Sequence, residues 1–156
     1  KSKYVEKNIK INGKEIEGGE IEVPFLFRSN VYSTFICKEK LMRGYYEGAW
    51  DVYRERKGNF ICYGYADTTG SQTYNLDLAR RRAEYVRDFL INIGYDPGRI
   101  FVQAIGETSD FDPHKNREAF EAYVRRQTFS LDEFVTDFQR ELLFNRRVAV
   151  HFVPPK

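Results

Sequence analysis

The chain has few cysteines, no long apolar run and no excess of charge of either sign. Two cysteines among 156 residues are too few for a disulfide scaffold, and they lack the spacing of metal ligands. No run of about 18 apolar residues that could span a membrane is present. Lys and Arg number 25 against 23 Asp and Glu, and the two signs alternate along the chain. We therefore expect no general affinity for nucleic acid.

The sequence also lacks the residue groups that an enzyme would need. His114, His151 and Cys62 stand without a recognisable catalytic neighbour. The stretch GYADTTG at 64–70 lacks the Gly-Lys-Ser/Thr ending of a phosphate-binding loop. We expect no catalysis, no cofactor and no metal site.

Two further features concern the cysteines and the start of the chain. Cys37 and Cys62 lie among apolar neighbours, which predicts small buried side chains. A disulfide between them is possible in an oxidising compartment, and the sequence does not decide whether it forms. The chain begins at Lys1 without a methionine or a signal-like apolar segment. We therefore expect a piece of a longer protein.

Alternation of apolar and polar residues predicts the strands. Asn12-Gly13 between alternating apolar residues predicts a small hairpin. Alternation from Ile21 to Phe27 predicts a half-buried strand with Leu26 on its other face, and Pro24 favours a sheet edge. Three further core strands are predicted at 58–67, 99–106 and 147–153.

Three-to-four spacing of apolar residues predicts the helices. A strong stripe from Leu78 to Ile93 predicts a helix that ends at Gly94. A segment over about 112–144 precedes the last strand and is too long for a bare loop, so a helical insert is expected there. The order of elements predicts an α+β fold, a mixed sheet covered by helices on one face. An earlier helix is predicted over 38–56, with a stripe of Leu41, Tyr45, Ala49 and Val52 or Tyr53.

One arginine interrupts the apolar stripe of the later helix. Leu78, Arg82 and Val86 stand four apart and share one face, so Arg82 points where leucine would be expected. An inward guanidinium costs several kcal/mol unless it meets carboxylates or other acceptors. Asp67 ends the preceding strand, and the helix rises only about 6 Å between Leu78 and Arg82. We expect Asp67 and Arg82 to lie around one small pocket.

Two interpretations of this pair stay open. In the first, a buried ion pair only fastens a loop to the helix. In the second, the two charges are held apart and receive a zwitterion: Arg82 binds a carboxylate in bidentate fashion and Asp67 binds an ammonium group. An amino-acid head group carries this charge pattern.

The stretch GYADTTGSQTYNLDLARRRAEYVRDFL, residues 64–90, resembles the signature of OmpA-like peptidoglycan-associated domains. That signature reads roughly G-x-[TA]-D-x-x-G, then Y-N-x-x-L-[SA]-x-x-R-A-x-x-V. The IGE at 105–107 and the NRRVAV at 145–150 resemble two further motifs of the family. The resemblance implies a β-α-β-α-β domain over 20–156, preceded by an arm at 1–19.

The resemblance also implies a function. Members of the family bind the peptide stem of peptidoglycan non-covalently through diaminopimelate, and so anchor a cell-envelope protein to the wall. It implies a periplasmic location attached to the outer membrane or envelope, with a membrane tether in upstream sequence. A further basic contact is expected from Arg146 rather than Arg147, and hydroxyl or backbone donors from Thr68 or Thr69. The implied ligand-binding residues are Asp67, Arg82, Asn75, Thr68 and Arg146.

Two departures from the family pattern bear on ligand or partner binding. Arg28 stands where the turn after the first strand usually has an acid. The sequence therefore does not decide which groups contact the far side of the ligand. The insert at about 112–144 is longer than usual, and we expect it to serve as a lid or a partner surface. The alternative function is a protein-interaction scaffold of the same fold, in which Asp67 and Arg82 are structural and the insert binds a partner.

Overall fold

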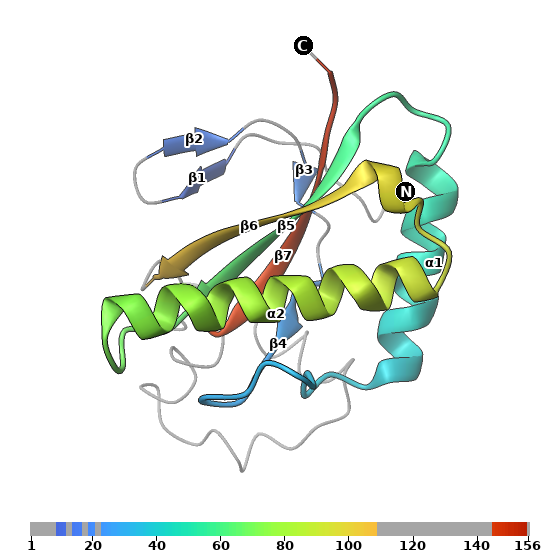
Figure 1. The fold of residues 1–156 in the computed structure, drawn as a ribbon. Helices are drawn as coiled ribbons and strands as arrows, with labels where there is room; N and C mark the ends of the chain where they lie inside the picture. Colours follow the sequence, from blue (N-terminus) through green and yellow to red (C-terminus); the bar gives the residue numbers. More distant parts are fainter. Residues whose placement is uncertain (1–8, 12–13, 17–18, 21–22, 109–144, 156) are drawn as a thin grey trace, which may run out of the picture.

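A mixed β-sheet forms one layer of the fold, and α2 runs across one face of it (Figure 1). The computed structural model describes residues 9–11, 14–16, 19–20, 23–108 and 145–155. The sheet has the order β3-β7-β5-β6, with β4 also paired to β7. Its strands are β3 (Gly19–Glu20), β4 (Phe25–Leu26), β5 (Asn59–Ala66), β6 (Ile100–Glu107) and β7 (Arg147–Val153).

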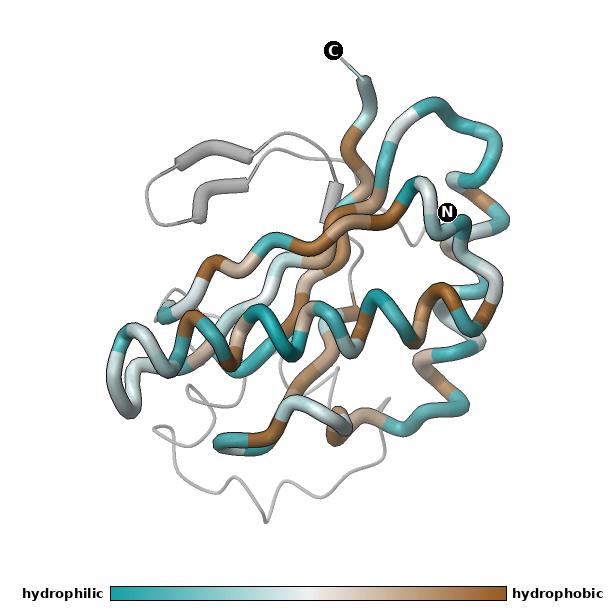
Figure 2. The backbone as a smooth tube through the Cα atoms, viewed as in Figure 1, coloured by the Kyte–Doolittle hydropathy of each residue, from teal (hydrophilic) through white to brown (hydrophobic). Residues whose placement is uncertain are grey.

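The central strand β5 has neighbours of both orientations. It pairs parallel to β6 and antiparallel to β7, so the sheet is mixed as predicted. The helices are α1 (Glu39–Tyr53) and α2 (Gln72–Asn92), and a short 3-10 helix, η1 (Pro97–Arg99), precedes β6. Figure 2 shows hydrophobic residues at several positions along the strands. The predicted α+β fold is confirmed.

Helix α2 ends where its sequence predicts, and it begins earlier than the predicted stripe, at Gln72. The Ser71 side chain accepts a hydrogen bond from the backbone N–H of Tyr74, which caps the first turn. Gly94 follows the last turn with a φ of 121°, a conformation that glycine adopts without strain. The Tyr95 N–H then bonds to the Leu90 carbonyl, which satisfies an orphan acceptor of the helix end.

Helix α2 lies very close to the carboxyl end of strand β5. A Cβ atom added at Gly64 would lie 2.0 Å from the backbone oxygen of Ala79, a distance that no real side chain allows. Glycine at 64 and alanine at 79 therefore permit the two backbones to touch. This contact brings Asp67, just beyond β5, toward the inward face of α2.

The buried stripe of α1 differs from the predicted one. Its buried side chains are Met42, Tyr46, Ala49 and Tyr53. Leu41 and Val52 are instead exposed at 41% and 43%. In the first half of α1, the buried residues lie one position later than predicted. Leu41 and Met42 are both apolar, and Tyr45 and Tyr46 are identical, so periodicity alone does not choose between the members of each pair.

Of the first predicted strand, at 21–27, the structure forms β4, and β3 lies just before that range. β3 and β4 both pair antiparallel with β7, at the sheet edge that Pro24 indicated. Phe25, Leu26 and Phe27 are all buried, so the expectation that Leu26 lies on an outer face is wrong. The reason is that the short edge strand is covered on both sides.

The remaining predictions concern the arm, the cysteines and the insert. β1 (Ile9–Ile11) and β2 (Lys14–Ile16) pair antiparallel, and Asn12-Gly13 between them lie outside the described residues. Cys37 and Cys62 are both buried, and no disulfide joins them. The predicted insert at 112–144 lies outside the described residues.

Candidate functional site

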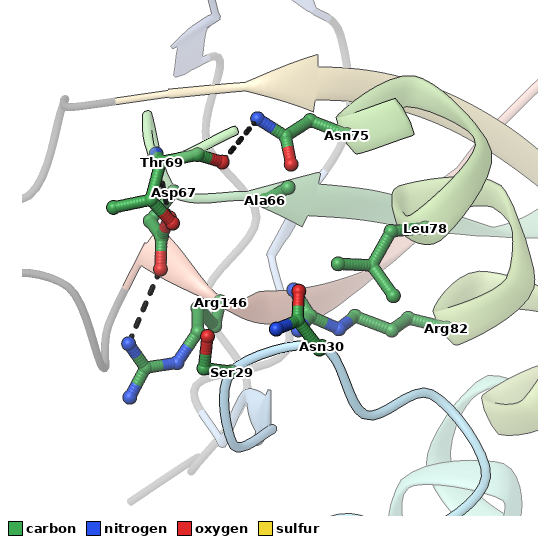
Figure 3. A pocket seen from close by; sticks show the side chains of 9 residues that line it. All are labelled: Ser29, Asn30, Ala66, Asp67, Thr69, Asn75, Leu78, Arg82 and Arg146. Atoms are coloured by element: carbon green, nitrogen blue, oxygen red, sulfur yellow. Dashed lines mark hydrogen bonds and ion pairs between the residues drawn. The ribbon is translucent and has the colours of Figure 1, made fainter. Parts of the chain in front are cut away.

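A small polar pocket lies at the carboxyl end of β5, beside the first turns of α2 and the turn at 28–31 (Figure 3). Its volume of about 10 Å³ holds roughly one water molecule. Because β5, α2, β7 and the turn all meet here, residues far apart in the sequence line it. They are Ser29, Asn30, Ala66, Asp67, Thr69, Asn75, Leu78, Arg82 and Arg146.

Arg82 is completely buried, as its place in the apolar stripe predicted. Its acceptors are three backbone carbonyls and not the expected carboxylate. Nε donates to the Val31 oxygen at 2.8 Å, one terminal nitrogen to Arg28 at 3.0 Å and the other to Tyr65 at 3.2 Å. The guanidinium also lies 5.3 Å from the ring centroid of Phe27. Arg82 thus ties the turn at 28–31 to the end of β5.

Asp67 forms its ion pair with Arg146 and not with Arg82. An Arg146 terminal nitrogen lies 3.2 Å from Asp67 Oδ2, and both side chains are buried. The other oxygen, Oδ1, accepts from the Thr69 N–H at 2.9 Å and from the Thr69 hydroxyl. Arg146 is further fixed because its Nε donates to the Phe27 oxygen at 2.9 Å. The predicted buried ion pair exists, with a different arginine.

The two arginines place more positive than negative charge in the site. Burial, with a smaller contribution from the charge of Arg146, lowers the pKa of Arg82 to about 10, and the charge of Asp67 opposes this shift. Burial also lowers the pKa of Arg146, whereas its hydrogen bond to Asp67 opposes that shift. A ligand carboxylate would relieve the repulsion between the two guanidinium groups.

Asn75 braces the loop that carries Thr69. Its amide nitrogen donates to the Thr69 oxygen at 2.7 Å and to Glu107 Oε1 at 2.9 Å. Glu107 reaches this point because the pairing of β5 with β6 shifts register after Gly64, where Gly106 has a φ of 91°. The IGE motif at 105–107 drew attention to this segment, but it did not indicate the contact of Glu107 with Asn75.

The structure places four of the five predicted ligand-binding residues on the pocket. Asp67, Arg82, Asn75 and Arg146 line it, whereas Thr69 does so in place of Thr68. Arg147 points to the other side of the sheet, where its guanidinium lies 4.1 Å from the ring centroid of Tyr65.

Sequence reasoning missed Ser29 and Asn30, which line the pocket from the turn at 28–31. Asn30 has a φ of 60°, a left-handed conformation that asparagine tolerates better than most residues. An asparagine in a turn is the signal that could have indicated this conformation. The position of the turn over the pocket, however, depends on the carbonyls that Arg82 holds.

The pocket has both hydrogen-bond donors and hydrogen-bond acceptors that are not fully used. Arg82 uses three of its five N–H donors in the described part of the chain, which leaves two on the terminal nitrogens. Asp67 accepts three hydrogen bonds and has room for about one more at Oδ2. Asn75 Oδ1 accepts no hydrogen bond from the described residues. The lining of the pocket therefore offers donors of the kind that a carboxylate accepts from and acceptors of the kind that an ammonium group donates to.

Within 23–108 and 145–155, no group of three or more His, Cys, Asp or Glu side chains is placed to hold a metal ion. Among the helices of that same portion, none has the length and apolar character to cross a membrane.

Sequence comparison relates part of the chain to known proteins. A model of the OmpA family matches residues 51–124. Outer membrane protein A of Bordetella avium is 34% identical over 58 residues, which are 37% of this chain and 30% of that protein. Outer membrane protein A of Klebsiella pneumoniae is 35% identical over 54 residues, 35% of this chain and 16% of that protein. The chain thus spans less than a third of the length of these relatives.

Solved structures share the fold at low sequence identity. The peptidoglycan-associated lipoprotein of Burkholderia pseudomallei has a TM-score of 0.57 at 19% identity, covering 83% of this chain and 89% of that one. The periplasmic domain of Helicobacter pylori MotB has a TM-score of 0.53 at 16% identity, covering 99% and 90%. Both are similar to this chain in the arrangement of sheet and helices.

Proposed function

We propose that this chain, which contains a domain of the OmpA family, binds peptidoglycan non-covalently and anchors a cell-envelope protein to the cell wall. The fold shared with a peptidoglycan-associated lipoprotein supports the proposal. The polar pocket at the end of β5 supplies a binding site of suitable chemistry. Such a function places the chain in the periplasm, with attachment to the outer membrane or envelope supplied by the rest of the parent protein.

The part of peptidoglycan that the pocket suits best is the diaminopimelate residue of the stem peptide. The side chain of diaminopimelate ends in a carbon that carries both an ammonium group and a carboxylate. Each terminal nitrogen of Arg82 has one donor beyond its bond to a carbonyl, and a carboxylate can accept two such donors. Asp67 Oδ2 and Asn75 Oδ1 match the ammonium group. This coexistence of unused donors and acceptors in one buried pocket is the observation that carries the proposal.

Arg146 contributes charge to the proposed site. It neutralises Asp67 across 3.2 Å, so Arg82 is left as the surplus cation. Without Arg146, the carboxylate of Asp67 would repel the carboxylate of the ligand. We therefore assign to Arg146 the role of compensating the negative charge of Asp67, so that the site favours a ligand that carries a carboxylate.

A specific observation favours the alternative, a protein-interaction scaffold. Arg82 holds three carbonyls and Asp67 holds an ion pair, so both residues have structural partners without any ligand. The surface that would bind a protein in this alternative, the insert at 112–144, lies outside the described residues. Substitution of Arg82 or Asp67 lowers stability in either case, so the discriminating change must be made in the ligand.

Isothermal titration calorimetry with the unaltered chain can compare two ligands that differ in this way. Muropeptides with a diaminopimelate stem are compared with otherwise identical ones with a lysine stem, because lysine has the ammonium group but not the carboxylate. A charge-assisted bidentate contact of roughly 1.5–3 kcal/mol corresponds to an affinity ratio of about 10 to 150 in favour of diaminopimelate. Equal affinities would remove the diaminopimelate assignment. Binding of neither muropeptide would remove the peptidoglycan function and leave the scaffold.

A further inference from the structure

The pocket is too small for its proposed guest as it stands. Its volume of about 10 Å³ admits roughly one water molecule, whereas an amino-acid head group occupies several times that space. The pocket can therefore enclose a head group only if at least one wall moves.

The walls differ in how firmly they are held. Thr69 is exposed, but its N–H and hydroxyl bond to Asp67 and its carbonyl accepts from Asn75. The opposite wall is formed by Ser29 and Asn30, which are both exposed. The only hydrogen bond of a side chain that holds this wall, among the described residues, is that of the Tyr74 hydroxyl to Asn30 Oδ1, at 3.2 Å. The wall at Ser29 and Asn30 is the weaker one.

The ends of this wall are fixed more strongly than its middle. Arg82 binds the carbonyls of Arg28 and Val31, the first and last residues of the turn, and the Val31 N–H bonds to the Arg28 oxygen at 3.2 Å. Bonds from a buried guanidinium to a carbonyl are stronger than an exposed bond between neutral groups. A movement of Ser29 and Asn30 between fixed ends therefore costs less than release of the whole turn.

We propose that Ser29 and Asn30 form a gate over the pocket and that the hydroxyl of Tyr74 is its latch. The inference rests on the proposed function, because the gate controls the admission of that ligand. Tyr74 is 46% exposed at the start of α2, so water competes for its hydroxyl and the latch opens readily. The ligand binds the open form. Its apparent affinity is therefore reduced by the fraction of molecules in which the gate is closed.

The latch is removed without loss of bulk by Tyr74→Phe. An exposed neutral hydrogen bond biases an equilibrium by about two- to tenfold. We expect the association rate constant for a diaminopimelate muropeptide to rise about two- to fivefold, with the dissociation rate constant unchanged. Asn30→Gly removes the acceptor while tolerating the positive φ, and should give the same gain. The double variant should gain no more than either single one, since both remove one bond.

Surface plasmon resonance with the immobilised full chain measures these rate constants. Tyr85→Phe, the same change at a half-buried position of α2 away from the pocket, is the control and should leave the rates unaltered. An unchanged association rate in Tyr74→Phe, with binding by the unaltered chain intact, overturns the gate and spares the proposed function. A lower affinity in that variant also overturns it, because it shows that the hydroxyl contacts the ligand. Absence of muropeptide binding by the unaltered chain overturns both.

Discussion

Arg82 and Arg99 use the same local device at opposite ends of β5. Each guanidinium binds three backbone carbonyls and so fixes a connecting segment to the sheet. Arg82 binds those of Arg28, Val31 and Tyr65. Arg99 binds those of Arg54, Arg56 and Gly58, at 2.6, 2.7 and 3.0 Å.

The surroundings of the two arginines are different. Arg99 is partly exposed, lies 5.6 Å from the ring centroids of Trp50 and Phe60, and has no ion-pair partner in the described part of the chain. Arg82 is fully buried beside a carboxylate and a second cation. Capture of carbonyls therefore suffices to fasten a loop, whereas the added charges make the pocket at Arg82 suitable for a ligand.

The largest expected effect comes from Arg82→Ala. The substitution leaves three carbonyls without their donor and opens a cavity under the turn at 28–31. We expect the free energy of unfolding to fall by about 3–5 kcal/mol. Urea denaturation followed by circular dichroism measures this value. A loss below about 1 kcal/mol would show that the turn is not held by Arg82.

Asp67→Asn sharpens the comparison by removing only a charge. The amide keeps an oxygen for Thr69 but leaves Arg146 buried without its carboxylate. We expect a loss of about 2–3 kcal/mol in the free energy of unfolding. Muropeptide binding, measured at a temperature where the variant is folded, should disappear. Full affinity in a folded Asp67→Asn protein would contradict the role assigned to this carboxylate.

Arg99→Ala is the counterpart at the other end of β5. Its carbonyl partners lie near the surface, where water can replace the lost donor. We expect a smaller loss of about 1–2 kcal/mol, with no change in muropeptide affinity. The same denaturation and calorimetry experiments apply. A drop in affinity here would mean that the two arginines are not functionally distinct.

Much of the fold follows from the sequence because its signals are local. The spacing of Leu78, Arg82 and Val86 predicted the inward guanidinium, and Gly94 predicted the end of α2. The stripe of α1 did not follow, because Leu41 and Met42 are adjacent and both apolar. The buried position of Met42 depends on contacts with distant strands, which periodicity does not record.

The partners within the site were harder to predict. Arg146 lies 79 residues from Asp67, so no local spacing relates them, and only the family resemblance suggested a basic residue there. The acceptors of Arg82 are backbone carbonyls, and any residue type supplies a carbonyl. The sequence could therefore indicate that Arg82 needs acceptors but could not identify them.

The account predicts that Arg82 meets the ligand and that Arg99 does not. Because both side chains have an Nε–H bonded to a carbonyl, their resonances can be followed together in ¹⁵N NMR spectra during titration with a diaminopimelate muropeptide. The Arg82 Nε–H signal should shift with saturation, together with the side-chain amide of Asn75, while the Arg99 signal stays in place. Saturable binding that leaves the Arg82 signal unmoved, or moves both arginine signals alike, would contradict the central claim.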